Sequence, residues 1–221
     1  MDPNGTCGES VGNQELNLAH VSADILCEFL EIAVHQILYI RDLYPQGIFE
    51  RRQKYNIPVQ ISRHPELNQY ITDAVLGIKP HVVKNEVQCV SVVLLSPSSQ
   101  PLERFVFEIT PPAEKKLEGV DDKLQRLEQS LRAFVLRLNT CDAMLQKLPP
   151  DCTFSILVYT KGSASMESNE KHLLQEFPWV EADDEMCQMK EARMIPLKSV
   201  SSDLLKMQLY IEQAPRKMEL T

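Results

Sequence analysis

Two glutamates and one histidine are spaced so that they would share one face of a helix. Glu28, Glu31 and His35 lie three and four residues apart within the apolar stretch 21–49, and side chains at these spacings are neighbours on a helix. Carboxylates next to an imidazole can bind a metal ion or move protons at a substrate. A metal site requires further ligands from elsewhere in the chain. We therefore favour the alternative that the three side chains form a solvated or hydrogen-bonded stripe.

The rest of the sequence offers little other catalytic chemistry. It contains no phosphate-binding, dinucleotide-binding, zinc-protease or nucleophile-elbow motif. The six cysteines include no C-x-x-C pair, so we expect free thiols rather than a disulfide framework or a zinc site. We predict a protein that is not an enzyme and that carries no metal or cofactor.

A short basic cluster follows the apolar stretch. Arg51, Arg52 and Lys54 could contact DNA, but the chain has a net charge of −8 and nucleic-acid binding depends on neutralising phosphates. We favour a solvated loop and expect no direct nucleic-acid binding. No run of about eighteen apolar residues is present, so we also expect no membrane span.

The elements that would position these residues follow from apolar periodicity. The stretch 21–49 predicts a long helix buried on several sides and ended by Pro45 and Gly47. Residues 1–14 lack periodicity and are expected to be disordered. We predict an α+β fold, a mostly antiparallel sheet backed by three helices. Its further elements are an edge strand at 57–61, helices at 64–80 and 121–148, and strands at 87–95, 102–110, 153–159, 193–198 and 203–213.

The segment 162–198 is long and irregular, and such segments in compact domains are commonly binding loops. Between residues 163 and 190 it holds seven acidic and two basic residues, a net −5. Trp179, the single tryptophan, could anchor this segment to the core or form part of a binding site, and the sequence does not separate the two. Tyr70 lies on the apolar face of its helix, which favours a core position.

Three strings together resemble the HORMA-domain proteins: CEFLEIAVHQILYIRDLYPQGIF, KYNIPVQ and HPELNQYI. The branch that they resemble is the mitotic-arrest-deficient B type, the non-catalytic accessory subunits of translesion DNA polymerase zeta. The resemblance runs from about 15 to about 212. It implies one HORMA domain over 15–221, with a core at about 15–161 and a safety belt and C-terminal strands at about 162–213.

In HORMA proteins the belt, here about 162–198, wraps over an extended partner peptide and locks it against the sheet. The resemblance implies a proline-containing peptide of the polymerase zeta catalytic subunit, with Tyr70 and Trp179 as its aromatic floor. It reverses the core interpretation of Tyr70. Glu181 departs from the family pattern, which expects an apolar residue at this position.

The resemblance implies two more surfaces. Met194, Gln208 and Tyr210 would bind the scaffold polymerase that inserts deoxycytidine, and Arg132 would pair HORMA domains as homodimer or heterodimer. Other implied partners are proline-motif proteins of double-strand-break repair and an AAA+ ATPase that remodels HORMA domains. The alternative is a checkpoint-type HORMA protein that inhibits the anaphase-promoting complex. In either case we expect a nuclear protein with some cytoplasmic fraction.

Overall fold

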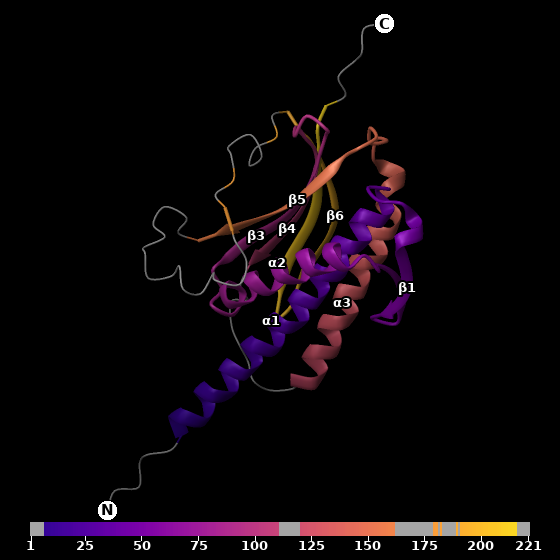
Figure 1. Ribbon diagram of the computed structural model, residues 1–221. Coiled ribbons are helices and arrows are strands. Elements are labelled where there is room, and N and C mark those ends of the chain that lie inside the picture. The colour runs from indigo at the N-terminus through magenta and orange to yellow at the C-terminus, as the bar shows by residue number, and fades with distance from the viewer. Residues whose placement is uncertain are drawn as a thin grey trace, which may run out of the picture.

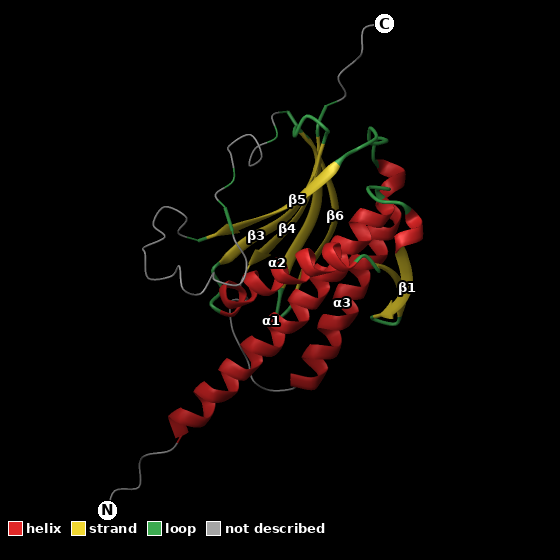
Figure 2. Cartoon of the chain, in the orientation of Figure 1, coloured by secondary structure: helices red, strands yellow, loops and turns green. Residues whose placement is uncertain are grey.

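The computed structural model describes residues 7–110, 120–161, 179–180, 182, 189 and 191–215, with the backbone alone for 7–18 and 120. Three α-helices lie on one face of a five-stranded antiparallel sheet in the order β5-β3-β4-β7-β6 (Figures 1 and 2). The α+β prediction is confirmed. The elements are α1 (Cys7–Ile40), β1 (Phe49–Lys54), β2 (Ile57–Ser62), α2 (Pro65–Val83), β3 (Val87–Leu95), β4 (Pro101–Thr110), α3 (Val120–Cys141), β5 (Thr153–Thr160), β6 (Arg193–Ser201) and β7 (Lys206–Gln213).

Helix α1 forms the centre of the core, as its two apolar rows predict. Phe29 is fully buried and meets Phe107 of β4 and Phe134 of α3 edge to face, with ring centroids 5.9 Å apart in both pairs. This geometry favours aromatic pairs beyond the area that they bury. One side chain of α1 therefore joins the sheet to the third helix.

Both ends of α1 differ from the prediction. Its C-terminus comes before Pro45, because Asp42 adopts a left-handed conformation (φ 50°). The Asp42 N–H donates to the Tyr39 carbonyl, and the Leu43 N–H donates to the Leu38 carbonyl. This is a Schellman motif, which satisfies the last carbonyls of a helix.

At the other end α1 begins at Cys7, so half of the segment expected to be disordered is helical. A helix that has nucleated gains one hydrogen bond per added residue, and two glycines do not stop it.

The basic cluster is part of a strand rather than a loop, which corrects the prediction. β1 and β2 form a two-stranded hairpin apart from the main sheet, joined by Tyr55 and Asn56 with φ of 50° and 56°. Two successive positive φ values are typical of the tight turns that match strand twist. Pro58 lies in β2, which among the described residues pairs with β1 alone, so the predicted edge position is confirmed.

Helix α3 is shorter than the predicted 121–148. It ends at Cys141 and continues as a single 3-10 turn, η2 (Asp142–Met144). The apolar periodicity runs on because Leu145 and Leu148 pack against the core from the connecting loop. Apolar spacing reports which residues are buried, and here a loop buries them.

A buried ionic network fastens α1 to the sheet. The Arg41 guanidinium donates two hydrogen bonds to the Glu103 carboxylate, Nε to Oε2 at 2.9 Å and Nη2 to Oε1 at 2.8 Å. It also pairs with Asp142 and donates to the Gln146 carbonyl. Gln213 Nε2, at the end of β7, donates to Glu103 Oε1 at 2.9 Å. The network therefore connects the first helix to the last strand.

Candidate functional site

Three aromatic side chains from distant parts of the chain meet at one edge of the main sheet. The Phe154 ring of β5 lies 5.7 Å from the Tyr70 ring of α2 and 6.4 Å from the Tyr44 ring, both edge to face. Tyr70 is 37% exposed, and the other two are half-buried. Partial burial raises the pKa of Tyr44 and of Tyr70, and a backbone hydrogen bond with Ile156 opposes the rise at Tyr70. These rings form a partly exposed apolar surface beside β5.

Tyr44 and Phe154 were not among the residues singled out from the sequence. They lie 110 positions apart, and Tyr70 stands between them in the chain. For Tyr44 the sequence offers one signal: this residue continues the apolar spacing of α1 beyond the end of the helix. Phe154 belongs to the alternating pattern of a strand, which indicates burial but gives no indication of a binding site.

The two outer strands of the main sheet differ in how receptive they are to a further strand. Among the described residues β5 pairs with β3 alone and β6 with β7 alone. β5 (TFSILVYT) has no charge and no proline. β6 carries Arg193, Lys198 and Pro196, and its register shifts between Pro196 and Lys198. Charges, proline and a bulge are devices that prevent edge pairing. Of the two outer strands in the described part of the chain, β5 is therefore the more receptive to a further strand.

Most of the predicted belt lies outside the described residues, but Trp179 and Ala182 are placed. Trp179 is half-buried and packs against the main core, which fills the helix-covered face of the sheet. Ala182 packs against Val93, Leu95 and Leu157 on the opposite face. Trp179 and Ala182 therefore contact opposite faces of the sheet. Residues 193–198 of the predicted belt belong to β6, and Glu181 lies outside the described part of the chain.

The three residues of the second expected surface lie together on the face of the sheet away from the helices. Met194 is 61% exposed, Gln208 is exposed and Tyr210 is half-buried. The register pairs Tyr210 with Pro196 and Met194 with Glu212. Leu209 and Ile211, which alternate with Gln208 and Tyr210 along β7, are buried in the core. The expected exposure of Gln208 and Tyr210 opposite the apolar row follows from this alternation.

The residue expected at a HORMA pairing surface is exposed on α3. Arg132 lies off the buried row of Leu127, Leu131, Phe134 and Leu138. Leu136, one turn further on, is also exposed. The described part of α3 thus offers an apolar side chain next to Arg132.

Glu28, Glu31 and His35 do not form a joint site. Lys54 pairs with Glu28 at 2.5 Å, and the Thr72 hydroxyl donates to Glu31 at 3.1 Å. His35 is buried, which corrects its place in a solvated stripe, and burial, assisted by the charge of Arg52, lowers its pKa from 6.5 to about 4. Within the described residues no cluster of three metal-ligating side chains is present. In this part of the chain, no helix combines the length and apolarity that crossing a bilayer requires.

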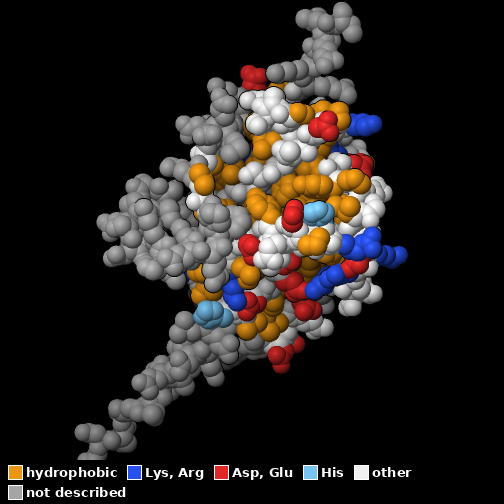
Figure 3. Space-filling model, in the orientation of Figure 1, with side chains coloured by type: hydrophobic (Ala, Val, Ile, Leu, Met, Phe, Trp, Pro, Cys, Tyr) orange, Lys and Arg blue, Asp and Glu red, His pale blue; other side chains and the backbone are white. Residues whose placement is uncertain are grey.

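The basic cluster is largely neutralised by neighbouring acids. Arg52 pairs with Glu50 at 2.6 Å, and Lys54 with Glu28. On the face shown in Figure 3, lysine and arginine side chains lie next to aspartate and glutamate.

The four cysteines whose side chains are described are free, and burial raises the pKa of Cys27 and of Cys141 to about 12. These thiols are poor nucleophiles.

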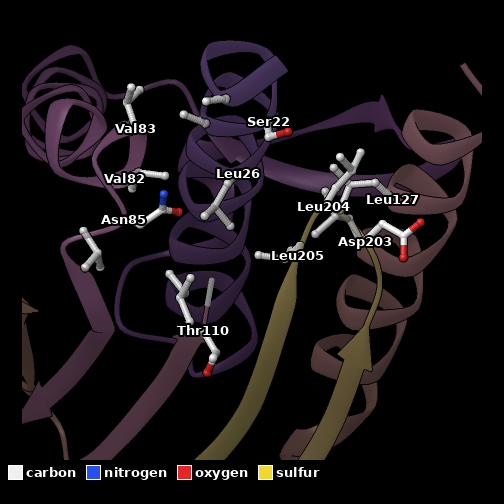
Figure 4. Close-up of a pocket in the computed structure, with 15 residues that line it drawn as sticks. Ser22, Leu26, Val82, Val83, Asn85, Thr110, Leu127, Asp203, Leu204 and Leu205 are labelled. Atoms are coloured by element: carbon white, nitrogen blue, oxygen red, sulfur yellow. The ribbon is translucent and has the colours of Figure 1, made fainter. Parts of the chain in front are cut away.

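A small cavity of about 60 Å³ lies between the three helices and the start of β7 (Figure 4). Its walls are mainly apolar, including Leu26, Leu127 and Leu205. Figure 4 shows the Asp203 carboxylate pointing away from Leu26 and Leu205, and Asp203 pairs with Lys123 at 3.6 Å. The one carboxylate among the residues that line the cavity is therefore engaged in an ion pair.

Comparison with known proteins places these features in context. The HORMA domain model matches residues 22–188. The human protein named mitotic spindle assembly checkpoint protein MAD2B is 50% identical over 204 residues, 92% of this chain and 96% of that protein. The DNA polymerase zeta processivity subunit of Arabidopsis thaliana is 34% identical, covering 85% of this chain and 83% of the relative. A chain in the crystal structure of the Mitotic Checkpoint Complex superposes with a TM-score of 0.73 at 24% identity, over 88% of this chain and 99% of that chain.

Proposed function

This chain belongs to the HORMA-domain family, in its MAD2B branch, and on that premise we propose that it is a non-catalytic adaptor of polymerase zeta. In this proposal it clamps a proline-containing peptide of the catalytic subunit along β5, with the C-terminal belt closed over the peptide. It then bridges this subunit to the deoxycytidyl-inserting scaffold polymerase during translesion synthesis. Proline-motif proteins of break repair would use the same site, in the nucleus.

The observation that carries the proposal is the outer edge of β5, a strand that pairs with β3 alone among the described residues, beside the rings of Tyr44, Tyr70 and Phe154. An extended peptide adds to such an edge through main-chain hydrogen bonds, while neighbouring pockets select its side chains. Proline suits an aromatic surface, because its ring is apolar and its backbone is already ordered. Trp179, which packs against the core on the helix side, fits the same floor.

The second surface supports the bridging role. Met194, Gln208 and Tyr210 lie on the face away from the helices and on the strands farthest from β5. A partner bound there would leave the β5 edge accessible. Two proteins could therefore bind at once, which is what a bridge requires.

A second candidate function is inhibition of the anaphase-promoting complex. It is favoured by the name of the MAD2B relatives, which refers to the spindle checkpoint. Both functions use the same peptide clamp. They differ in the partner and are separated by whether the protein lowers ubiquitin transfer in a reconstituted reaction.

Calorimetry with synthetic peptides tiled along the polymerase zeta catalytic subunit tests the proposal. We expect a proline-containing tile to bind, and Tyr70→Ala or Trp179→Ala to weaken its binding by about 2 kcal/mol, as truncation of aromatic anchors does. Gln208→Ala is the matched control and should leave peptide affinity unchanged, because distant sites act independently. If no tile binds the wild-type protein, the adaptor proposal is wrong.

A further inference from the structure

A buried arginine lies next to the scaffold-polymerase surface, the name used here for Met194, Gln208 and Tyr210. Arg104 of β4 alternates with phenylalanines that are buried in the core, so its side chain lies on the face of the sheet away from the helices. The register pairs Arg104 with Glu212 of β7, and Glu212 in turn with Met194 of β6. Arg104 is therefore two strands away from Met194 and shares a face with this surface.

Two contacts hold the Arg104 side chain in place. Its Nε pairs with Glu212 Oε2 at 3.1 Å, and the guanidinium carbon lies 5.7 Å from the centroid of the Tyr159 ring of β5. The side chains of Arg104 and Glu212 are 10% and 20% exposed, so water and salt screen this pair less than a surface pair. A cation above an aromatic ring is attracted by the electron-rich face of the ring. Arg104 therefore connects β7 to β5 across the outer face of the sheet.

The connection from Glu212 to Tyr159 runs next to Tyr210. In the register Tyr210 pairs with Val106 of β4, two residues beyond Arg104. Through β3 the same row reaches a residue of β5 that comes two positions before Tyr159. Arg104, Tyr159 and Tyr210 also line one hollow of about 560 Å³. Burial raises the pKa of Tyr210, and the charge of Arg104 opposes this rise. Arg104 is therefore a neighbour of Tyr210 on the side of β4.

We propose that Arg104 is a positioning residue of the scaffold-polymerase surface, which holds Glu212 and the Tyr210 ring in the arrangement that the partner binds. The inference rests on the proposed function, which assigns this surface. Tyr210 and Glu212 point to the same face of β7, so the ion pair of Glu212 with Arg104 limits the space open to the Tyr210 ring. Without the guanidinium, the half-buried Glu212 carboxylate loses this partner and turns towards water. The partner must then order both side chains on binding, which lowers affinity.

Calorimetry with the scaffold polymerase domain tests the role of Arg104 in binding. Arg104→Met removes the charge and should weaken binding by about fivefold, the effect of one lost polar contact. Arg104→Lys can still pair with Glu212 and lie over Tyr159, so it should stay within about twofold of the wild type. Arg193→Met is the matched control, because Arg193 precedes Met194 on β6 and points to the other face. All three variants should bind a proline-containing peptide as the wild type does. Equal binding of the scaffold domain by Arg104→Met and wild type would overturn the inference.

NMR on the free protein tests the positioning of Tyr210 without a partner. Wild type and Arg104→Lys should show the α–β proton couplings of a single Tyr210 χ1 rotamer, and Arg104→Met should show averaged couplings. Tyr159→Leu removes the ring contact and leaves the ion pair. It should shift the couplings in the same direction and weaken binding of the scaffold domain by about twofold.

The outcomes separate the inference from the function on which it rests. Tyr210 couplings that are the same in wild type and Arg104→Met contradict the positioning role. If Arg104→Met also loses peptide binding and fails to fold, Tyr159→Leu takes its place, and unchanged couplings in that variant overturn the inference. If the wild type does not bind the scaffold polymerase domain, the proposed bridging function fails, and the couplings alone decide whether Arg104 positions Tyr210.

Discussion

Replacement of Glu103 by alanine should destabilise the protein far more than replacement of any exposed acid. The side chains of Arg41 and Glu103 are 4% and 2% exposed, and two hydrogen bonds join them. Glu103→Ala leaves the Arg41 charge buried with Asp142 and the Gln146 carbonyl as its remaining partners. Removing one member of a buried pair costs about 3–5 kcal/mol. The lost bond from Gln213 adds about 1 kcal/mol.

Asp142 compensates Arg41 in part, but its side chain is 57% exposed and its charge is screened by water. We therefore expect a net loss near the lower bound, about 3 kcal/mol. Urea denaturation followed by circular dichroism measures it. With a slope of about 2 kcal/mol per molar, the midpoint should fall by about 1.5 M. Glu50→Ala, which removes the exposed partner of Arg52, is the control and should cost less than about 1 kcal/mol.

The double variant Arg41→Met, Glu103→Leu distinguishes two possible causes of the destabilisation, an isolated buried charge and the loss of packing. Apolar side chains of similar volume often replace a buried ion pair without loss, so the double variant should be more stable than Glu103→Ala. If Glu103→Ala costs no more than Glu50→Ala, the buried pair does not hold α1 to the sheet. If the double variant is the least stable of all, the argument from an isolated buried charge is wrong.

Three further predictions concern the site and its surroundings. Phe154→Ala should weaken binding of a proline-containing peptide by about 2 kcal/mol in calorimetry, while Arg132→Ala leaves the affinity unchanged; equal affinities would exclude Phe154 from the site. Changing Gln208 and Tyr210 together to alanine should abolish binding of the scaffold polymerase domain in a pulldown and preserve peptide affinity, and loss of both would contradict two separate surfaces. Because the folded-state pKa of His35 is about 4 and its ordinary value is 6.5, the unfolded chain binds the proton more readily. Stability should therefore fall by about 3 kcal/mol between pH 6.5 and 4, and denaturation of His35→Gln across this range should show that part of the pH dependence removed.

The sequence alone determined the fold class and, among the described α-helices and strands, every element except β1. Apolar spacing in α1 and alternation in β7 are local consequences of which side of an element faces the core. They located the buried helix and placed Gln208 and Tyr210 on the face of β7 opposite its buried row. Resemblance to the HORMA family, carried by the strings around α1 and α2, agreed with the family match over residues 22–188.

Element ends were less well predicted, because they depend on local backbone conformation and on partners elsewhere in the chain. Helix α1 stops at a left-handed Asp42 rather than at Pro45, and α3 stops where Arg41 binds Asp142. His35 shows the same limit. Its spacing placed it with Glu28 and Glu31, but the β1–β2 hairpin pairs Lys54 with Glu28, and His35 is buried.

Only the tertiary structure decided the composition of the candidate site. Tyr44, Tyr70 and Phe154 come from the end of one helix, the face of another and a strand, and no spacing relates them. Which backbone groups of β5 point away from β3 depends on the register carried across β7, β4 and β3. A linear pattern records which residues are buried. Pairing across the sheet determines which edge is open and which side chain lies on it.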